Sequence, residues 1–129
     1  MPSDGFPKNF RPSEFECKCC KKLPNRAGAR HLAWCLQQVR NLANAPIKIN
    51  SAYRCPEHNA KVGGVKNSQH LSGLAADIVC NTVPPRMLAN IVEELMKDGR
   101  IPNGGIGRYD TFTHVDIRPN GPARWDNRS

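Results

Sequence analysis

The sequence predicts a single α+β domain in which helices back one small antiparallel sheet. The chain has 129 residues and is 39% hydrophobic, which is enough for one modest core. Two long segments carry apolar residues at three- and four-residue spacing, as an amphipathic helix does. Several shorter segments alternate apolar and polar residues, which is typical of half-buried strands.

Residues 1–12 are polar and rich in proline, so we expect an extended N-terminal arm, with the domain itself over residues 13–129. Ser13 can cap a short helical turn at the start of that domain. The first long helix is predicted over residues 27–43, where one face is apolar.

The remaining elements follow from alternation, from glycine and from proline. A pair of prolines favours the start of a second long helix, and glycine favours its end. In chain order we expect a strand over 47–53, a short helix over 59–62, a strand over 74–79, a helix from Pro84 to Gly99, and strands over 105–108 and 113–117.

The chain is basic, with a net charge of +8 and an isoelectric point near 9.5. Such a charge favours binding to polyanions, which include nucleic acids and the anionic polymers of a cell envelope. Lys and Arg are scattered from Lys8 to Arg128 instead of gathering on one stripe. Because nucleic-acid readers concentrate their basic residues, we expect no specific nucleic-acid binding.

No run of eighteen apolar residues occurs, and the first residues lack the apolar core of a signal peptide. We therefore expect no transmembrane segment and no classical secretion. Synthesis in the cytoplasm and a monomeric state are the corresponding expectations.

Residues 68–77 read Ser-Gln-His-Leu-Ser-Gly-Leu-Ala-Ala-Asp and contain two candidate metal ligands, His70 and Asp77. Gly73 allows a bend between them, so both side chains can converge. A third ligand, His114, lies in an alternating segment that puts Phe112, His114 and Asp116 on one face of a strand. Two histidines and a carboxylate can bind zinc and leave a fourth position for water, which is the arrangement of catalytic zinc.

These residues resemble the hedgehog-fold zinc peptidases of bacterial cell walls, which include D-Ala-D-Ala carboxypeptidases, D-Ala-D-Ala dipeptidases and L-alanyl-D-glutamate endopeptidases. Residues 68–77 fit the pattern S-x-H-x-x-G-x-A-x-D at every fixed position, and His114 matches the C-terminal histidine. The resemblance covers roughly residues 10–125. Further matches are Ser51-Ala-Tyr-Arg54, Gly105-Ile-Gly-Arg-Tyr109, Phe112-Thr-His-Val-Asp116 and Ala123-Arg-Trp125.

The resemblance implies the same fold and one catalytic Zn²⁺ held by His70, Asp77 and His114. It implies hydrolysis of amide bonds in peptidoglycan stem peptides or cross-links, as a carboxypeptidase or an endopeptidase. A phage-type lysin that reaches the cell wall after release, or on a virion, fits the absence of a signal peptide. The alternative is a zinc-bearing cell-wall binding module without turnover, since hedgehog signalling domains share the fold.

The proton shuttle is less well marked than the ligands. In relatives an acidic residue often lies three positions before the last histidine, and here that position is Thr111. We expect Asp116 to be the catalytic carboxylate, with Asp110 as the second candidate. The alternative for Asp116 is a carboxylate that orients a ligand histidine through its other ring nitrogen.

Three further residues are predicted to bind substrate. Arg54 is expected to hold a carboxylate or carbonyl of the peptide, although a surface ion pair is the alternative. Ser68 is expected to hydrogen-bond the substrate or its own loop. Tyr109 is expected to stabilise the oxyanion or else to serve as a packing aromatic. His31 and His58 lack any such context and are predicted not to be ligands.

The six cysteines leave three alternatives open: free thiols, disulfides or a structural metal site. Cys17-Lys-Cys-Cys20 contains one Cys-x-x-Cys, for which Cys35 is a candidate further ligand. Cys55 and Cys80 end two predicted strands and are candidates for a disulfide.

Overall fold

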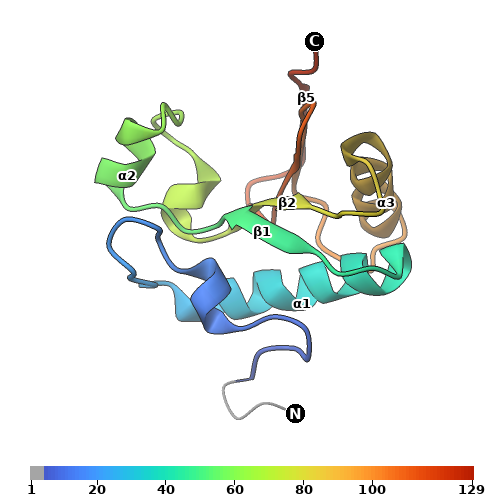
Figure 1. The fold of residues 1–129 in the computed structure, drawn as a ribbon, viewed down its shortest axis with the longest axis horizontal. Coiled ribbons are helices and arrows are strands. Elements are labelled where there is room, and N and C mark those ends of the chain that lie inside the picture. The colour runs from blue at the N-terminus through green and yellow to red at the C-terminus, as the bar shows by residue number, and fades with distance from the viewer. Residues whose placement is uncertain (1–4) are drawn as a thin grey trace.

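The structure of the chain, a computed structural model, describes residues 5–129. Its helices and strands are, in chain order, η1 Pro12–Phe15, α1 Arg26–Ala43, β1 Lys48–Ser51, α2 Pro56–Lys61, η2 Gln69–Ser72, β2 Ala75–Val79, α3 Pro85–Lys97, β3 Gly105–Arg108, β4 Thr113–Asp116 and β5 Ala123–Asp126, where η denotes a 3-10 helix. The strands form one sheet in the order β1-β2-β4-β3-β5. Helices α1 and α3 lie against this sheet (Figure 1), so the predicted α+β class is confirmed.

All neighbouring strands of the sheet are antiparallel except β3 and β5, which are parallel. The residue pattern predicts the other four strands but not β5. Only alternate residues of this four-residue edge strand are even partly buried, so its hydrophobic pattern is weak. The strand depends on pairing with β3, which is distant enough in sequence to leave no local signal.

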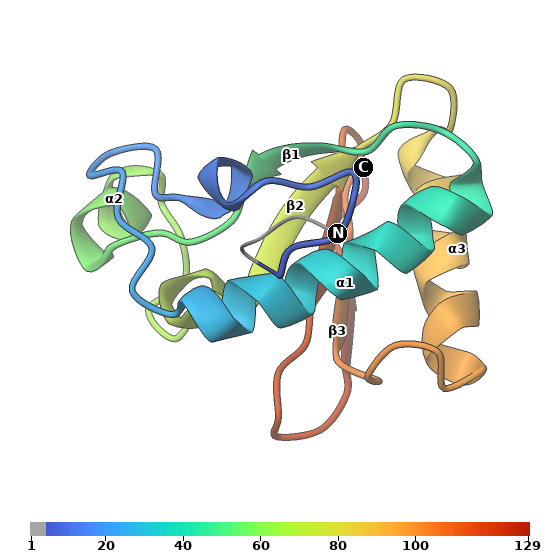
Figure 2. The same ribbon diagram turned by 90° about the horizontal axis from the view of Figure 1, so that it is seen from below.

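Helix α1 lies below the sheet and crosses its strands (Figures 1 and 2). Its N-terminus is capped by the Asn25 side chain, which accepts a hydrogen bond from the Gly28 N–H. The helix ends at Asn44, whose φ of 53° is left-handed. Leu32 and Leu36 are fully buried on the face toward the sheet. The predicted amphipathic helix is therefore present, one residue longer at its start.

Helix α3 begins at a proline, as the sequence predicts, and Leu88, Val92 and Leu95 form its buried stripe. It packs against α1, β3 and β4. Together the two long helices cover one side of the sheet, and the opposite side is left for the polar residues of the candidate site.

The segment before η1 contributes aromatic side chains to the core. Phe6 and Phe10 are at most 2% exposed, and both rings contact Phe15, with centroids 5.8 and 6.3 Å away. Residues 5–11 contain no helix or strand, and residues 1–4 of the predicted arm lie outside the described part of the chain. The division of the chain at residue 12 remains a prediction.

Strand β1 is shorter than the predicted strand over residues 47–53. Its pairing with β2 is irregular between Ile49 and Ser51. Beyond it, the Tyr53 N–H donates to the Phe15 carbonyl and the Arg54 N–H to the His70 carbonyl, instead of to a neighbouring strand. The short helix α2 then begins at Pro56, earlier than predicted, because proline suits the first helical position.

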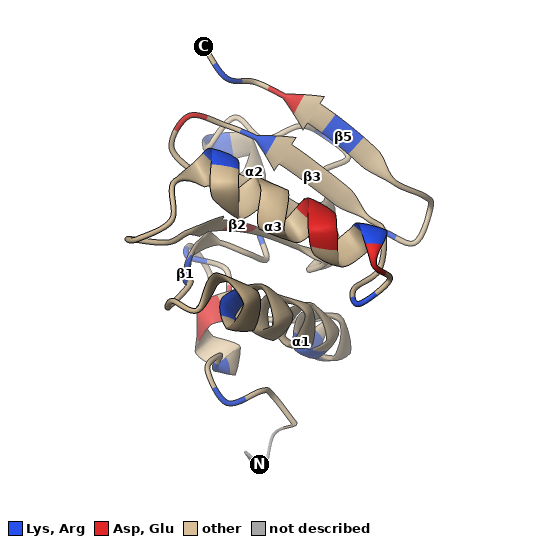
Figure 3. Ribbon diagram, turned by 90° about the vertical axis from the view of Figure 1, so that its right-hand side faces the viewer, with Lys and Arg blue, Asp and Glu red and all other residues tan. Residues whose placement is uncertain are grey.

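Within residues 5–129, no helix has the length and apolarity needed to cross a bilayer. Lys and Arg occur on α1, α3, β3 and β5 in the view of Figure 3 instead of on one element.

Candidate metal centre

One row of residues across the sheet organises the candidate site. In this row Ser51 of β1 pairs with Asp77 of β2, Asp77 with His114 of β4, His114 with Gly107 of β3, and Gly107 with Trp125 of β5. Directly opposed side chains in a sheet lie on the same face within contact distance. Asp77 and His114 are therefore neighbours because of strand register, although 37 residues separate them.

His70 reaches the same point from η2, not from a strand. The Ser68 side chain caps this 3-10 helix by accepting from the His70 N–H at 3.1 Å. Gly73 ends it with a φ of 77°, a left-handed conformation that favours glycine. The predicted bend between His70 and Asp77 is thus present, and it turns the chain from η2 into β2.

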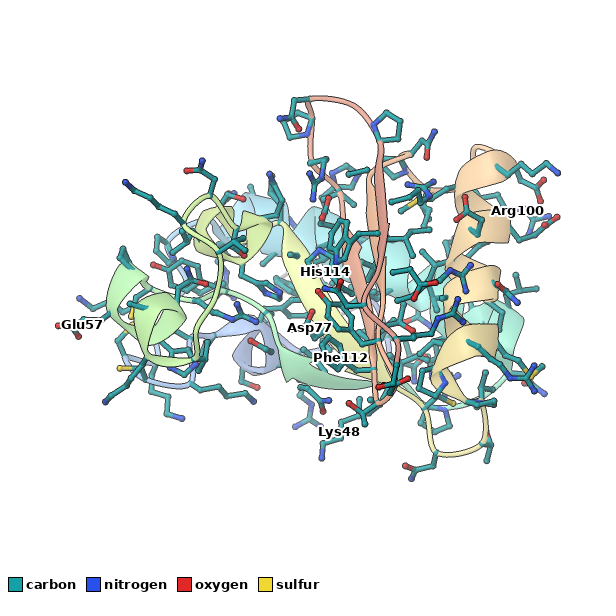
Figure 4. The ribbon with its side chains drawn as sticks, turned by 90° about the horizontal axis from the view of Figure 1, so that it is seen from above. Lys48, Glu57, Asp77, Arg100, Phe112 and His114 are labelled. Carbon is teal, nitrogen blue, oxygen red and sulfur yellow. The ribbon has the colours of Figure 1, made fainter. Side chains whose placement is uncertain are left out.

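The three predicted ligands converge on the face of the sheet opposite to α1, where Figure 4 shows Asp77 and His114 together. Asp77 Oδ1 lies 3.2 Å from His70 Nε2 and 3.1 Å from His114 Nδ1. One donor atom from each of the three residues lies within 4.8 Å of the other two. All three residues are buried.

The outer nitrogen of each imidazole donates its hydrogen elsewhere. His70 Nδ1 lies 2.7 Å from the Ala52 carbonyl oxygen, which can only accept. His114 Nε2 lies 2.8 Å from Asp116 Oδ2, a carboxylate oxygen that also accepts. In the neutral tautomers the inner nitrogens therefore carry no hydrogen, and their lone pairs face the Asp77 carboxylate. Such a cluster of acceptors requires a cation or added protons among them, so it fits a metal ion.

The electrostatics of the site point the same way. Burial raises the pKa of Asp77, but hydrogen bonds with His114 and His70 outweigh burial and hold that pKa below its ordinary value. Burial lowers the pKa of His114, but the carboxylates of Asp116 and Asp77 outweigh burial and raise it. The site therefore favours ionised carboxylates and attracts positive charge.

Arg54 lies beside the ligands, and its side chain is held by three partners. Nη2 donates to Asp77 Oδ2 at 3.2 Å, Nη1 to Asn59 Oδ1 at 3.1 Å and Nε to Ser51 Oγ at 3.2 Å. The Arg54 side chain is 14% exposed and lines the same cavity as the ligands. Arg54 thus binds the second carboxylate oxygen of Asp77, and part of its guanidinium faces the cavity.

Asp116 lies behind His114 and is fully buried. Its carboxylate accepts hydrogen bonds from His114, from the Gly105 N–H at 2.9 Å and from Arg118 Nε and Nη2 at 2.8 and 2.7 Å. Burial raises the pKa of Asp116, but Arg118 and His114 outweigh burial and hold it well below its ordinary value. The group is an ionised carboxylate whose oxygens are all engaged.

Asp110 is exposed in the turn between β3 and β4, and its carboxylate accepts hydrogen bonds from the Ser129 backbone and hydroxyl. Thr111 is exposed in the same turn. Of the carboxylates in residues 5–129, Asp77 alone is among those that line the cavity.

The cavity over the ligands has a volume of about 590 Å³ and includes the predicted residues Arg54, Ser68 and Tyr109 in its wall. The Tyr109 ring stacks on Phe112 at a centroid distance of 4.3 Å. Its hydroxyl oxygen accepts a hydrogen bond from Trp125 Nε1 at 2.8 Å, and within the described chain the hydroxyl hydrogen has no acceptor. That hydrogen is therefore free to meet a bound molecule.

Two residues of the cavity wall, Trp125 and Arg118, are not among the sequence-predicted site residues. The Trp125 ring lies 4.8 Å from the His114 ring, and the Arg118 guanidinium lies 5.6 Å from the Trp125 ring centroid. The Ala-Arg-Trp segment carries the only sequence signal for Trp125, because its strand, β5, is not predicted.

Two glycines of β3 leave the space that these side chains fill. A Cβ at Gly105 would lie 2.2 Å from Asp116 Oδ2, and a Cβ at Gly107 would lie 2.4 Å from Trp125 Nε1. The Gly-x-Gly segment thus leaves β3 without side chains on the face of the sheet that carries His114.

Gly107→Ala is expected to displace the Trp125 indole and to weaken its hydrogen bond to Tyr109. Because the new methyl group has no room, we expect a loss of about 1–3 kcal/mol in the free energy of unfolding. Chemical denaturation, with Trp fluorescence as the signal, measures this loss. Gly99→Ala is a control for added volume, because a Cβ there meets nothing within 4 Å, although its φ of 74° adds backbone strain. Equal stability of Gly107→Ala and the wild type would contradict the packing argument.

Of the three alternatives for the cysteines, the structure has the free thiols. All six are free thiols in the structure. Cys80 follows the end of β2, which pairs with the start of β1, whereas Cys55 lies beyond the end of β1. The antiparallel register therefore separates this pair, and the predicted disulfide candidate is wrong. Cys35 is buried in α1, where burial raises the pKa of its thiol to about 12. Cys35 belongs to neither group of candidate metal ligands in the described chain.

The fold and the ligand set define a class of small α+β domains built around one candidate metal site of two histidines and an aspartate. Residues 8–116 match the family model for Peptidase M15, which is most of the chain. The protein therefore belongs to the Peptidase M15 family, and the family predicted from the sequence motifs is confirmed.

A relative with a named activity matches part of the chain. A segment of 54 residues is 41% identical to the zinc D-Ala-D-Ala carboxypeptidase of Streptomyces albus G. The aligned segment is 41% of this chain and 21% of the relative, so the chain covers about a fifth of the relative's length.

Proposed function

We propose that the protein is a zinc-dependent peptidase that hydrolyses amide bonds in the stem peptides or cross-links of peptidoglycan. The convergence of His70, Asp77 and His114, with the outer imidazole hydrogens committed to Ala52 and Asp116, carries the proposal. Membership of the Peptidase M15 family and the similarity to a zinc D-Ala-D-Ala carboxypeptidase support it.

Zinc suits this donor set, because imidazole nitrogen and carboxylate oxygen in a three-ligand site leave one position open. When bound, it lowers the pKa of a coordinated water and polarises a carbonyl group. A cavity of about 590 Å³ above the ligands is large enough for a short peptide segment. Peptide-bond hydrolysis is the reaction that this combination supports.

The cavity residues have distinct tasks in this proposal. Arg54 presents the free part of its guanidinium to a carboxylate or carbonyl of the peptide, while the rest of the group holds Asp77. Tyr109 donates its hydroxyl hydrogen to the carbonyl oxygen as negative charge develops there. Ser68 caps η2 and so positions His70.

For Asp116 we propose the alternative role identified from the sequence, that of orienting His114. A fully buried carboxylate that already accepts from Gly105, Arg118 and His114 is poorly placed to take a proton from a water in the cavity. It fixes the tautomer and the orientation of the His114 ring.

Incubation of the purified protein with zinc and defined muropeptides tests the proposal, with mass spectrometry of the products to identify the bond cut. The D-Ala-D-Ala bond, the L-Ala-D-Glu bond and a cross-link give different product masses. Release of one product set, which ends when a chelator is added, is the expected result. Intact muropeptides after prolonged incubation with zinc would contradict it.

Tyr109→Phe is expected to lower kcat by about 10²–10³-fold, the effect of losing one donor to a developing oxyanion. The phenyl ring keeps the stacking on Phe112 but cannot accept from Trp125 Nε1, so the stability of the variant is measured beside its kinetics. Steady-state kinetics on the muropeptide that the wild type cleaves measures this change. Tyr53→Phe, at a half-buried tyrosine outside the cavity wall, is the matched control. Unchanged kcat for Tyr109→Phe would remove Tyr109 from the chemistry.

A zinc-bearing cell-wall binding module is the second candidate. The observation in its favour is that, of the carboxylates in the described chain, Asp77 alone is among the cavity-lining residues. A module would bind muropeptides in a zinc-dependent manner and leave them intact, so the same incubation distinguishes the two candidates.

We further propose degradation of the cell wall, as by an endolysin, as the biological setting. The net charge of +8 favours adsorption to the anionic polymers of the envelope. Binding to purified walls with and without those polymers, at low and high salt, tests this part separately from catalysis.

A further inference from the structure

Three cysteine thiols gather at a point that the proposed peptidase chemistry does not use. The Sγ atoms of Cys17, Cys20 and Cys55 all lie within 4.8 Å of one another. Cys17 and Cys20 belong to the turn after η1, whereas Cys55 comes 38 residues after Cys17, between β1 and α2. The fold therefore brings together thiols from two distant segments.

The turn that carries Cys17 and Cys20 is closed by its own backbone. The Lys21 N–H donates to the Cys17 carbonyl at 2.9 Å, and the Cys17 N–H donates to the Lys22 carbonyl at 3.1 Å. Lys21 has a left-handed φ of 60°, which turns the chain back on itself. The two thiols of this Cys-x-x-Cys are thereby held on one side of the turn, at the sequence spacing typical of zinc ligands.

Backbone N–H groups point at the sulfur atoms. Cys17 Sγ accepts from the Cys55 N–H at 3.4 Å. Cys55 Sγ accepts from the His58 N–H at 3.4 Å. Hydrogen bonds of this kind stabilise sulfur that carries negative charge, as in a metal-bound thiolate.

We propose that Cys17, Cys20 and Cys55 hold a second, structural zinc ion, with the thiol of Cys19 as the fourth ligand. Zinc–sulfur bonds of about 2.3 Å in a tetrahedron place the sulfur atoms roughly 3.8 Å apart, which this cluster meets with small side-chain movements. Cys19 belongs to the same turn and its side chain is exposed, so it is free to rotate toward the cluster. A site with four protein ligands has no open position, so its role is to hold structure.

The structure also indicates what such an ion would hold. Cys55 directly follows Arg54, and its N–H donates to Cys17 Sγ, while the Tyr53 N–H donates to the Phe15 carbonyl. The chain around Arg54 is therefore tied on both sides to the segment before α1. The two groups of candidate ligands share no residue, so they form two separate metal sites. The second ion would fasten the N-terminal segment to the base of the cavity.

Elemental analysis of zinc per chain tests the proposal. The protein is purified under reducing conditions, loaded with zinc and freed of excess metal. We expect two zinc ions per wild-type chain and one each for Cys20→Ser and Cys55→Ser. Cys80→Ser is the matched control, because this half-buried cysteine lies outside the cluster, and it should keep two. A wild type with one ion per chain, and cysteine variants that keep that one ion, would overturn the proposal.

His114→Ala protein separates this site from the proposed active site. Loaded with cobalt, it is expected to retain one ion and to show the intense near-ultraviolet charge-transfer absorption of thiolate-bound cobalt. Loss of that absorption in His114→Ala/Cys20→Ser would assign it to the cluster. A His114→Ala chain without the absorption would refute the second site. A disulfide that includes Cys17, Cys20 or Cys55 would also refute the second site. Under non-reducing conditions such a disulfide lowers the mass of the chain by two hydrogens relative to the fully reduced chain. Muropeptide hydrolysis plays no part in these readouts, so they can fail independently of the proposed function.

Discussion

Replacing His114 by alanine is expected to remove zinc from the His70, Asp77 and His114 site and to abolish muropeptide hydrolysis. The variant loses one of three converging donors and leaves the Asp116 carboxylate without its imidazole partner. The loss should exceed the roughly 10–100-fold that follows when only a hydrogen-bond partner of a metal ligand is removed. Zinc affinity and kcat/KM, measured on the same preparation, check this prediction.

His31→Ala is the matched control for His114→Ala. His31 is exposed on α1 and lies outside the candidate metal centre. The control should keep the zinc affinity and the kcat/KM of the wild type. A His114→Ala protein that is folded and hydrolyses muropeptides at the wild-type rate would show that hydrolysis takes place without this site.

Asp116→Asn is expected to weaken zinc binding about 10–100-fold and to lower stability, although the side chain never reaches the cavity. Asparagine replaces one carboxylate oxygen by an NH2 group, which donates and cannot accept, so either the bonds from His114 and Arg118 Nη2 or those from Gly105 and Arg118 Nε lose their acceptor. Breaking a buried charge pair costs up to about 3–5 kcal/mol, and the smaller end applies here because Arg118 is 20% exposed. Zinc titration and chemical denaturation measure the two effects.

The pH–rate profile of Asp116→Asn distinguishes an orienting carboxylate from a proton shuttle. If Asp116 orients His114, saturating zinc should restore most of kcat, and the acid limb of the profile should remain. If Asp116 is the proton shuttle, kcat should stay low at saturating zinc and the acid limb should disappear. Asp110→Asn tests the second predicted carboxylate under the same conditions, and we expect wild-type kcat, because Asp110 is an exposed carboxylate bound to Ser129.

The ligands could be predicted from the sequence because local patterns place them. His70 and Asp77 lie on either side of a glycine bend within ten residues, and alternation puts His114 and Asp116 on one face of a strand. The structure adds the register that makes Asp77 and His114 direct neighbours in β2 and β4. That register depends on long-range pairing, which no local pattern specifies.

Other parts of the site depend on tertiary packing that the sequence does not reveal. Trp125 reaches His114 only because β5 pairs in parallel with β3 and because Gly107 leaves the space between them. Arg118 lies two residues beyond Asp116, and both its backbone N–H and its guanidinium donate to the Asp116 carboxylate, a contact that the alternation of residues does not specify. In the same way, Cys55 joins Cys17 and Cys20 through the path of the chain after β1, which the alternation of residues does not specify.

The most direct test is a crystal structure of the zinc-loaded protein, with anomalous diffraction on both sides of the zinc absorption edge. We predict an anomalous peak about 2.0–2.2 Å from His70 Nε2, an Asp77 carboxylate oxygen and His114 Nδ1. The outer nitrogens of the two imidazoles should keep their contacts with Ala52 and Asp116. An absence of zinc among these three side chains in crystals grown with excess zinc would contradict the central claim.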